Sequence, residues 1–382
     1  MSELFHMGPE ASAAAAERYR TSDVGQLHAA LVGTPSLSHE EAAAADLLEA
    51  HFIQHGVATR RIGDNVLAWV GEGPHTLLLN SHLDVVPPSA DHPFDPFSPT
   101  VNGSEVFGRG TVDAKGCVAS MATALCRLQA VGVPAGTQVM GAFTVCEETG
   151  GQDNGLEAIR SELPALAAAL IGEPTHMQPC VAQKGLLILR LDAKGKSSHA
   201  ARAEEGDNAI SRMMRDLQRV ETWSFDRVHP FLGETTMNVT VIEGGTARNV
   251  IPDACSAWLD LRTTPEYSHP EIARMLDEAL ESDVVIHSGR FIPVDTPSTA
   301  SIVRACLSAR DGAESFGSPT MSDWIHVHDI PAVKIGPGDS RRSHTAHESI
   351  DVFELHASCD IYTSIISAFL SDASTSLDAP TG

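Results

Sequence analysis

The sequence contains no run of basic residues and no long apolar stretch. Lys and Arg number 26 against 50 Asp and Glu, which gives a formal net charge of -24 at pH 7. Nucleic acids are bound through clustered Lys and Arg side chains, so this charge balance argues against a nucleic-acid partner. A membrane span requires roughly 18 to 20 uninterrupted apolar residues, and no segment approaches that length. We therefore expect neither a nucleic acid nor a membrane as partner.

Paired cysteines and a secretory leader are also missing. The seven cysteines are odd in number and form no Cys-x-x-Cys pair. Several of them lie in apolar segments, which is typical of buried, reduced thiols and indicates a reducing compartment. The first residues, MSELFHMGPEASAAAAERY, show no basic segment followed by a long apolar one, as a signal peptide would. These absences predict a soluble, cytoplasmic protein.

What is present fits a globular protein of two domains. The chain has 382 residues, of which 42% are hydrophobic and 20% charged, which is more than one ordinary core requires. In the first part, apolar periodicity predicts helices at residues 12–32, 38–56 and 115–130 and strands at 65–70, 76–81, 138–146 and 167–172. Ser38 and Glu41 form a capping-box pattern at the second helix. Strands that alternate with helices imply an α/β fold with a doubly wound, mostly parallel sheet.

The pattern changes near residue 180. Strands are predicted at 185–193, 236–243, 255–262 and 283–287, with helices at 207–220 and 269–281. After residue 291 the α/β pattern returns, with a helix at 298–309, a strand at 332–335 and a helix at 352–370. We therefore predict one domain built from 1–180 and 291–382, with an α+β domain inserted at 181–290. The polar tail from about residue 371 is expected to be disordered.

Acidic and histidine residues follow three of the predicted strands directly. His82 ends one apolar run, Glu147 and Glu148 follow the second, and Glu173 follows the third. The carboxyl ends of parallel strands lie at one edge of a sheet, where ligands collect. One such residue is more often a solvated loop residue or a helix cap than a ligand. Here three strands place histidine or acidic residues at one edge, and the glycine-rich loop at 108–116 lies between them in the sequence. Together these features indicate a functional site.

Seven segments carry a specific resemblance. They are SHLDVVP, GRGTVDAKG, EETGG, GEPT, GKSSHAAR, GGTARNVIPD and GPGDSRRSHTAHE. In content and order they are similar to the signature blocks of the acetylornithine deacetylase / succinyl-diaminopimelate desuccinylase family of dinuclear zinc amidohydrolases, over about residues 20–370. The resemblance implies a catalytic domain of the zinc-exopeptidase type and an inserted ferredoxin-like domain, which serves as a lid and joins two copies into a homodimer.

The resemblance also implies two divalent metal ions, Zn²⁺ or alternatively Co²⁺. His82 and Glu173 match the ligands of one ion, Glu148 and His344 match those of the other, and Asp113 matches the bridge between them. Histidine and carboxylate ligands suit these ions. Crowded carboxylates in one cleft would also repel each other without cations to neutralise them, which is an independent argument for metal.

Two further carboxylates receive catalytic roles. By resemblance, Glu147 is the general base that takes a proton from the attacking water and returns it to the leaving amine. Asp84, two residues after His82, matches the carboxylate that orients the imidazole, although a turn-forming role remains an alternative. The family pattern selects His344 over His347 as ligand. It also implies a cis peptide bond between Asp113 and Ala114.

The inserted domain is expected to contribute to the site. His199 matches a family histidine that reaches the active site of the partner subunit and stabilises the oxyanion, with a surface histidine as the alternative. Asn249 and Arg262 match substrate-binding residues of the lid. An arginine suits an α-carboxylate, although Arg262 could also form a structural salt bridge. The loop with Gly336 and Gly338 is expected to line the same pocket.

The resemblance favours hydrolysis of an N-acyl amino acid. The preferred substrates are N-acetylornithine, N-succinylornithine or an N-acylcitrulline, in arginine biosynthesis. A succinyl-diaminopimelate desuccinylase of lysine biosynthesis is the first alternative. An aminoacylase or dipeptidase, and a non-catalytic metal-stabilised binding protein, are the others. Lys184, Arg341 and Arg342 could receive a succinyl carboxylate or be solvated surface charges, so the acyl group stays open.

Overall fold

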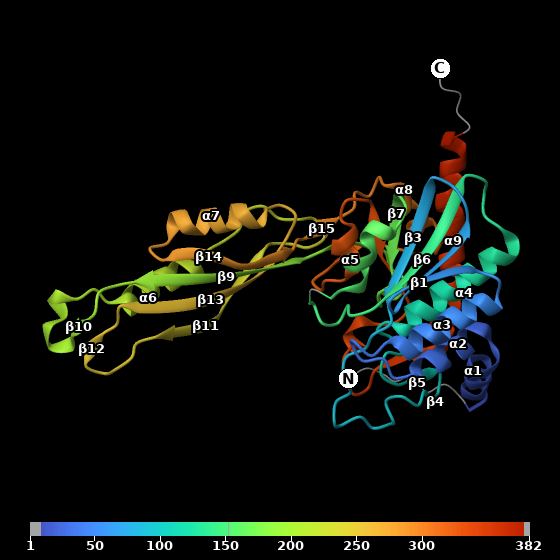
Figure 1. Cartoon of the computed structure of the whole chain (residues 1–382), viewed down its shortest axis with the longest axis horizontal. Helices are drawn as coiled ribbons and strands as arrows, with labels where there is room; N and C mark the ends of the chain where they lie inside the picture. The colour runs from blue at the N-terminus through green and yellow to red at the C-terminus, as the bar shows by residue number, and fades with distance from the viewer. Residues whose placement is uncertain (1–8, 152, 378–382) are drawn as a thin grey trace, which may run out of the picture. The chain divides into compact units, whose positions relative to one another are not determined.

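The chain folds into two compact units in the computed structural model, which describes residues 9–151 and 153–377 (Figure 1). Unit 1 comprises the described residues up to Val181, Thr296–Ser315 and the described residues from Ser322 onward. Unit 2 comprises Ala182–Asp295 and Phe316–Met321. The sequence pattern predicted an insertion at 181–290 only. The later segment joins unit 2 because Lys184 donates its backbone N–H to the carbonyl oxygen of Ser318 at 3.0 Å.

The sheet of unit 1 has a parallel centre and antiparallel flanks. Four parallel strands form the centre, in the order β6 (Thr137–Thr144), β3 (His75–His82), β7 (Leu166–Ile171) and β17 (Ala332–Lys334). Antiparallel neighbours flank them, namely β1 (Ala58–Ile62) and β2 (Asn65–Gly71) beside β6, and β8 (Cys180–Gln183) beside β17. The predicted α/β class with a mostly parallel central sheet is confirmed.

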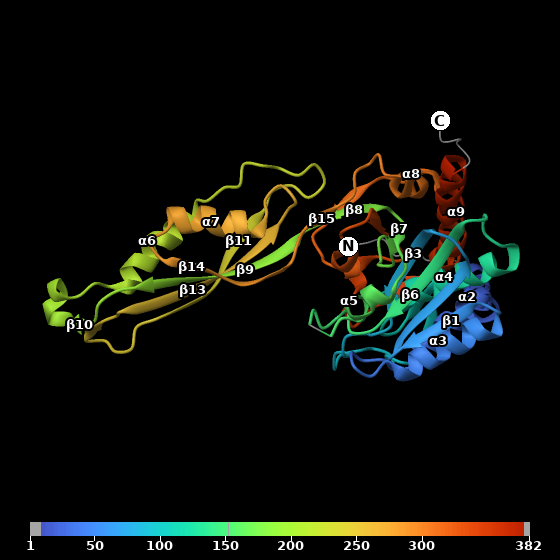
Figure 2. The same ribbon diagram turned by 45° about the horizontal axis from the view of Figure 1, so that its top comes forward.

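Helices pack on this sheet and enclose a continuous apolar core. They are α1 (Pro9–Thr21), α2 (Asp23–Val32), α3 (Ala42–Gln54), α4 (Lys115–Val131), α5 (Gly155–Ile159), α8 (Ser301–Ser308) and α9 (Val352–Leu377). α4 packs against β2, β3 and β6 and lies beside α2 and α9 (Figure 2). In the core, the rings of Phe52 in α3 and Phe143 in β6 lie 5.6 Å apart. Within the described residues, no helix is long and apolar enough to cross a membrane.

Short strands and single turns lie within the connecting segments of unit 1. A three-stranded antiparallel sheet has the order β18 (Ser349–Asp351), β5 (Glu105–Phe107) and β4 (Thr100–Asn102). Single 3-10 turns are η1 (Arg160–Glu162), η3 (Asp323–Val327) and η4 (Ser340–Arg342). The sequence pattern missed these elements, because three-residue strands and turns are too short to show a period.

Three predicted helices differ from the structure. The expected helix at 12–32 is divided at Ser22, whose hydroxyl accepts the N–H of Gly25 at 3.2 Å and caps α2. The capping box at Ser38 is wrong, because α3 begins at Ala42 and both polar side chains bond elsewhere, Ser38 to Asp84 and Glu41 to Cys146. The last helix continues to Leu377 instead of ending near residue 370. Residues 378–382 of the expected tail lie outside the described residues.

Unit 2 has the expected ferredoxin-like arrangement. Its antiparallel sheet has the order β11 (Thr236–Gly244), β13 (Ala254–Thr263), β9 (Gly185–Lys194) and β14 (Asp283–Phe291). The helices α6 (Ala209–Glu221) and α7 (His269–Ala279) complete the β-α-β-β-α-β order along the chain. Buried residues alternate along β9 and β13, and their inward leucines form one core with α6 and α7.

Short pairs complete unit 2. β10 (Ser198–His199) pairs with β12 (Val250–Ile251), and β15 (Val294–Asp295) pairs with Ala182 and Gln183 of β8. β16 (Phe316–Ser318) also pairs with β8, and η2 (Ala200–Glu205) follows β10.

Candidate metal centre

The ends of β3, β6 and β7 bring the predicted acidic and histidine residues to one edge of the sheet in unit 1. β3 pairs in parallel with β6 on one side and with β7 on the other. One set of ligand atoms that lie within 4.8 Å of one another comes from His82, Asp113 and Glu148, and a second comes from His82, Glu147 and Glu173. His82 belongs to both sets and is 1% exposed, so it lies at the middle of the cluster.

The five predicted ligands form a continuous series of contacts. Glu173 Oε1 lies 3.9 Å from His82 Nε2, which lies 3.2 Å from Asp113 Oδ1. Asp113 Oδ2 lies 3.4 Å from His344 Nε2, which lies 2.9 Å from Glu148 Oε1. Asp113 therefore contacts both histidines, one through each carboxylate oxygen. This is the position that a bridging ligand between two ions would require.

Asp113 is held in this position by a buried ion pair that the sequence reasoning missed. The Oε1 atom of Glu348 accepts the backbone N–H groups of Val112 at 3.1 Å and Asp113 at 3.2 Å. Its other oxygen pairs with the guanidinium of Arg109, and both residues are 1% exposed. Arg109 lies in the segment GRGTVDAKG, and Glu348 ends the segment SHTAHE. Their place in these two motifs is the sequence signal that could have identified them. The expected cis peptide bond between Asp113 and Ala114 is present.

Asp84 is fully buried and contacts the backbone of Glu147 and Glu148. Its Oδ1 accepts the backbone N–H of Glu147 at 3.1 Å, and its Oδ2 accepts that of Glu148 at 3.1 Å and the hydroxyl of Ser38 at 2.7 Å. His82 Nδ1 lies 3.0 Å from the carbonyl oxygen of Asp84 and 3.3 Å from its carboxylate. The residue thus fixes the backbone that carries both glutamates and contacts the imidazole as well.

Charge and burial at this edge fit divalent cations. Burial, together with the charge of Asp113, raises the pKa of Glu173 to about 8. Burial and neighbouring carboxylates also raise the pKa of Glu147 well above its usual value, against the opposing charge of His82. Hydrogen bonds to Asp113 and Glu148 raise the pKa of His344 to about 10. Divalent ions at this edge would offset the crowded carboxylate charge, and a donor set of carboxylates and imidazoles suits zinc-like ions.

The other histidines near the site do not join the cluster. His347 is exposed and lies close enough to Asp91 and His92 to affect their charge. His328 donates its Nδ1–H to the carbonyl oxygen of Ile325 at 2.7 Å. His344 is the histidine of its segment that contacts Asp113 and Glu148, and its role as a metal ligand stays a prediction.

Gly336 and Gly338 support the backbone behind Glu173. The carbonyl oxygen of Gly336 accepts the N–H groups of Thr175 at 3.0 Å and Met177 at 2.8 Å. A Cβ atom at Gly336 would lie 2.6 Å from the carbonyl oxygen of Glu173, so no side chain fits there. Gly338 has a positive φ of 91°, a conformation that favours glycine. Contact of these glycines with substrate remains a prediction.

The predicted residues of unit 2 lie at two separate places within that unit. The exposed His199 accepts the N–H of Ala201 at Nδ1 (3.1 Å), and the carbonyl oxygen of Asn249 accepts the N–H of Ala200 at 2.9 Å. Both lie near the Ala254 end of β13. Arg262 is eight residues further along this strand, roughly 26 Å away at about 3.3 Å per residue. It pairs with Asp260 at 2.9 Å, the structural alternative raised from the sequence.

Comparison with known proteins places the chain in a family. The acetylornithine deacetylase of Myxococcus xanthus is 31% identical over 307 residues, which are 75% of this chain and 78% of the relative. The succinyl-diaminopimelate desuccinylase of Dinoroseobacter shibae is 28% identical over 376 residues, 90% of this chain and 98% of the relative.

Solved structures share the fold. A dinuclear metal-binding peptidase of the M20 family from Bacillus subtilis has a TM-score of 0.70 at 15% identity, covering 93% of this chain and 99% of that one. The sequence profile described as peptidase family M20/M25/M40 matches residues 78–368. Because this match spans most of the sequence, the chain belongs to peptidase family M20/M25/M40.

Proposed function

We propose that this chain hydrolyses the amide bond of an N-acyl amino acid at a centre of two divalent ions, with zinc as the first choice and cobalt as the alternative. His82 and Glu173 would hold one ion, Glu148 and His344 the other, and Asp113 both. The observation that carries the proposal is the place of Glu147. It lies within 4.8 Å of His82 and Glu173 but outside the series of contacts that joins the five proposed ligands.

Glu147 is suited to proton transfer. Burial raises its pKa well above that of a free glutamate, and a general base works best when its pKa is near the working pH. It takes a proton from the attacking water and gives it to the amide nitrogen as the C–N bond breaks, which releases a carboxylate and an amine. When bound, the two ions supply the positive charge that polarises the carbonyl group and favours deprotonation of water.

The preferred substrates are N-acetylornithine, N-succinylornithine or an N-acylcitrulline, in arginine biosynthesis. Support comes from the acetylornithine deacetylase of Myxococcus xanthus, which at 31% identity is more similar in sequence than the desuccinylase of Dinoroseobacter shibae at 28%. Succinyl-diaminopimelate is the second candidate, because that desuccinylase aligns with 90% of this chain and 98% of its own length. Aminoacylase or dipeptidase activity, or metal-dependent binding without turnover, are the remaining alternatives.

Unit 2 is proposed to form a homodimer in the cytoplasm and to complete the site of the partner. The support is that His199 is exposed and bonds only to the nearby backbone of Ala201 among the contacts described. The edge strands β11 and β14 also carry exposed apolar side chains, among them Val241 and Ile286, which a second copy would cover. In this arrangement His199 stabilises the oxyanion in the other subunit, and Asn249 and Arg262 bind polar groups of the substrate.

A substrate panel tests the proposal. Rates are measured on acetylornithine, succinylornithine, acetylcitrulline and succinyl-diaminopimelate, with Zn²⁺ or Co²⁺ added. We expect turnover of an ornithine or citrulline derivative and a preference over succinyl-diaminopimelate. The reverse preference would assign the desuccinylase function, and no turnover of any substrate would overturn the proposal.

The variant Glu147→Ala tests the proposed base. It should lower kcat by a factor of roughly 10² to 10⁴, while metal content measured by mass spectrometry is unchanged. Glu157→Ala, at an exposed glutamate of α5, is the matched control and should leave both quantities as they are. Wild-type kcat in Glu147→Ala would remove this residue from the mechanism.

A further inference from the structure

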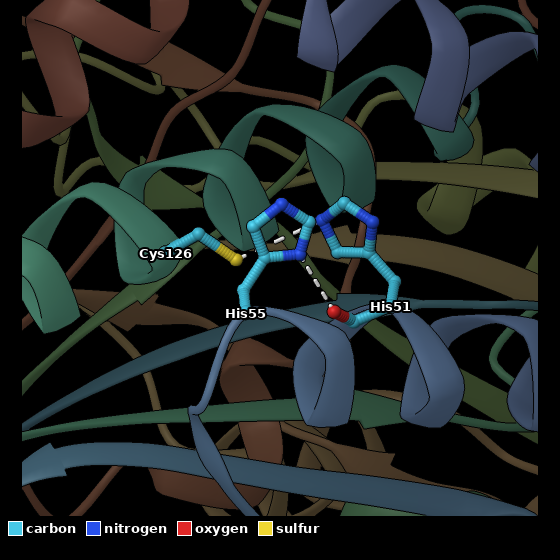
Figure 3. A group of neighbouring side chains, drawn as sticks. All are labelled: His51, His55 and Cys126. Atoms are coloured by element: carbon cyan, nitrogen blue, oxygen red, sulfur yellow. Dashed lines mark hydrogen bonds between the residues drawn. The ribbon is translucent and has the colours of Figure 1, made fainter.

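A second group of metal-ligating side chains lies in unit 1, away from the carboxyl ends of the strands. His51 lies in α3, His55 caps the C-terminal end of that helix, and Cys126 lies in α4 (Figure 3). Cys126 is eleven residues along α4 from Lys115, about 17 Å at roughly 1.5 Å per residue. The three ligand atoms lie within 4.8 Å of one another. Neither histidine belongs to any motif that the proposed function uses.

The distance between two ligand atoms of this group is close to that in a tetrahedral site. His51 Nε2 lies 3.7 Å from Cys126 Sγ. A tetrahedral zinc ion bound to one imidazole nitrogen and one thiolate holds the two atoms about 3.6 Å apart, as follows from its usual bond lengths. The rings of His51 and His55 lie 4.3 Å apart between centroids, so both imidazoles face the same small space (Figure 3).

His55 makes the hydrogen bond that metal-bound histidines usually make. Its Nδ1 lies 2.8 Å from the carbonyl oxygen of His51, and a carbonyl can only accept, so Nδ1 carries the proton. The lone pair is therefore on Nε2. Metal-bound histidines commonly donate their second ring N–H to a carbonyl or carboxylate in this way, which fixes the ring and its tautomer.

The surroundings give an ion both access and charge compensation. A hollow of about 400 Å³ reaches the two histidines and is also lined by Gln54 and, from the start of α2, by Asp23 and Gln26, whereas Cys126 lies outside its lining. Burial lowers the pKa of His51 to about 4, which leaves its ring neutral and able to coordinate. Burial and the charge of Asp23 raise the pKa of the Cys126 thiol to about 12, so the thiol keeps its proton until a bound ion displaces it. The carboxylate of Asp23 also acts on His51. It would offset part of the charge of a bound cation.

We propose that His51, His55 and Cys126 form a further transition-metal site, for Zn²⁺ or a similar borderline-soft ion, which links the C-terminal end of α3 to α4. Imidazole and thiolate ligands select such ions over Mg²⁺ or Ca²⁺. The Cys126 thiol loses its proton to solvent as the S–metal bond forms. Water or Asp23 supplies the fourth ligand. The site does not depend on the proposed hydrolase activity.

Cobalt binding to the full chain tests this site. Metal-free protein is titrated with Co²⁺, and ions per chain are counted by mass spectrometry while near-ultraviolet absorption reports sulfur-to-cobalt charge transfer. His55→Ala and Cys126→Ala should each bind one ion fewer than the wild type and lose the charge-transfer band. His287→Ala and Cys255→Ala, which change an exposed histidine and a buried cysteine of unit 2, are the controls and should match the wild type.

The difference between variant and wild type is independent of how many ions the centre at the strand ends binds. The five ligands proposed there contain no sulfur, so a thiolate band that disappears in Cys126→Ala belongs to a different site. Equal stoichiometry in wild type, His55→Ala and Cys126→Ala would overturn the proposal. So would a charge-transfer band that persists in Cys126→Ala.

Discussion

Asp84 shows how much of the site depends on one buried side chain. It accepts the backbone N–H groups of the proposed base Glu147 and the proposed ligand Glu148, together with the hydroxyl of Ser38. Burial would raise its pKa, but hydrogen bonds and the charge of His82 lower the pKa below its usual value, so the carboxyl group is ionised. An ionised carboxylate accepts hydrogen bonds at both oxygens, which the two N–H groups require.

Asp84→Asn should therefore destabilise the protein and reduce activity together. The new amide would present N–H donors to at least one backbone N–H group, and a buried donor without an acceptor costs about 1–3 kcal/mol. Urea unfolding measures the free energy, and kcat is measured on the substrate found active in the panel. Asp360→Asn, at a side chain that is 80% exposed, is the control. Equal stability of the two variants would contradict this role of Asp84.

At the scale of elements, α2 anchors the loop that carries Asp113. His28 of α2 is fully buried, accepts the hydroxyl of Tyr19 at 2.8 Å and donates to the carbonyl oxygen of Thr111 at 2.9 Å. Lys115, at the start of α4, donates to the carbonyl oxygens of Leu31 and Thr34 at the end of α2. Burial lowers the pKa of Lys115 to about 7, and its two hydrogen bonds hold the amino group at the end of α2. His28 and Lys115 together join α2 to the loop that carries Asp113.

The buried His28 predicts a pH dependence of stability. Burial lowers its pKa from 6.5 to about 4, so the folded protein holds the neutral ring. The stabilisation from His28 is complete above pH 6.5 and is lost as the pH falls toward 4, because the unfolded chain binds the proton first. The loss reaches about 3 kcal/mol.

The test compares the wild type with His28→Gln by urea unfolding between pH 7 and 4. The difference in unfolding free energy between them should shrink toward acid pH by about this amount. His287→Ala, which changes an exposed histidine, should keep a constant difference from the wild type. Parallel curves for wild type and His28→Gln would refute the prediction.

The sequence predicted the elements that carry the site better than those that support it. The apolar runs of β3, β6 and β7 are continuous and each ends in a histidine or an acid, so their type and shared edge were readable. The division between α1 and α2 at Ser22 could not be predicted from the sequence, because the apolar residues of the two helices together keep one helical period. Ser38 and Glu41 were misassigned because a local capping pattern cannot reveal that Asp84 and Cys146, distant in sequence, compete for their side chains.

At the scale of the whole molecule, the separation of His199 from Arg262 within unit 2 constrains any shared site. His199 lies near Ala254, and the strand from Ala254 to Arg262 spans roughly 26 Å at about 3.3 Å per residue, which exceeds the length of an acylated amino acid. A small substrate bound at the Arg262 end of β13 is therefore far from His199 of the same chain. If both bind it, at least one acts from a second copy, which is the arrangement that the proposed dimer provides.

Two inactive variants should restore activity when they share a dimer. Co-expressed Glu147→Ala and His199→Ala chains should recover about a quarter of wild-type activity, because half of the random dimers are mixed and one of their two sites is intact. Glu147→Ala co-expressed with Glu173→Ala is the control, since both changes damage the same centre of unit 1 and no intact site can form. Isolated mixed dimers without activity would exclude a contribution of His199 across subunits.

The order of the proposed ligands along the chain determines when the metal centre can be assembled during synthesis. His82, Asp113, Glu148 and Glu173 are translated before unit 2, and His344 is translated after it. At about 5–20 residues per second, the roughly 170 residues between Glu173 and His344 take on the order of 10 to 30 s to translate. During that time the nascent chain displays carboxylates without their last histidine. Loading with both proposed ions would therefore be complete only after unit 2 has left the ribosome.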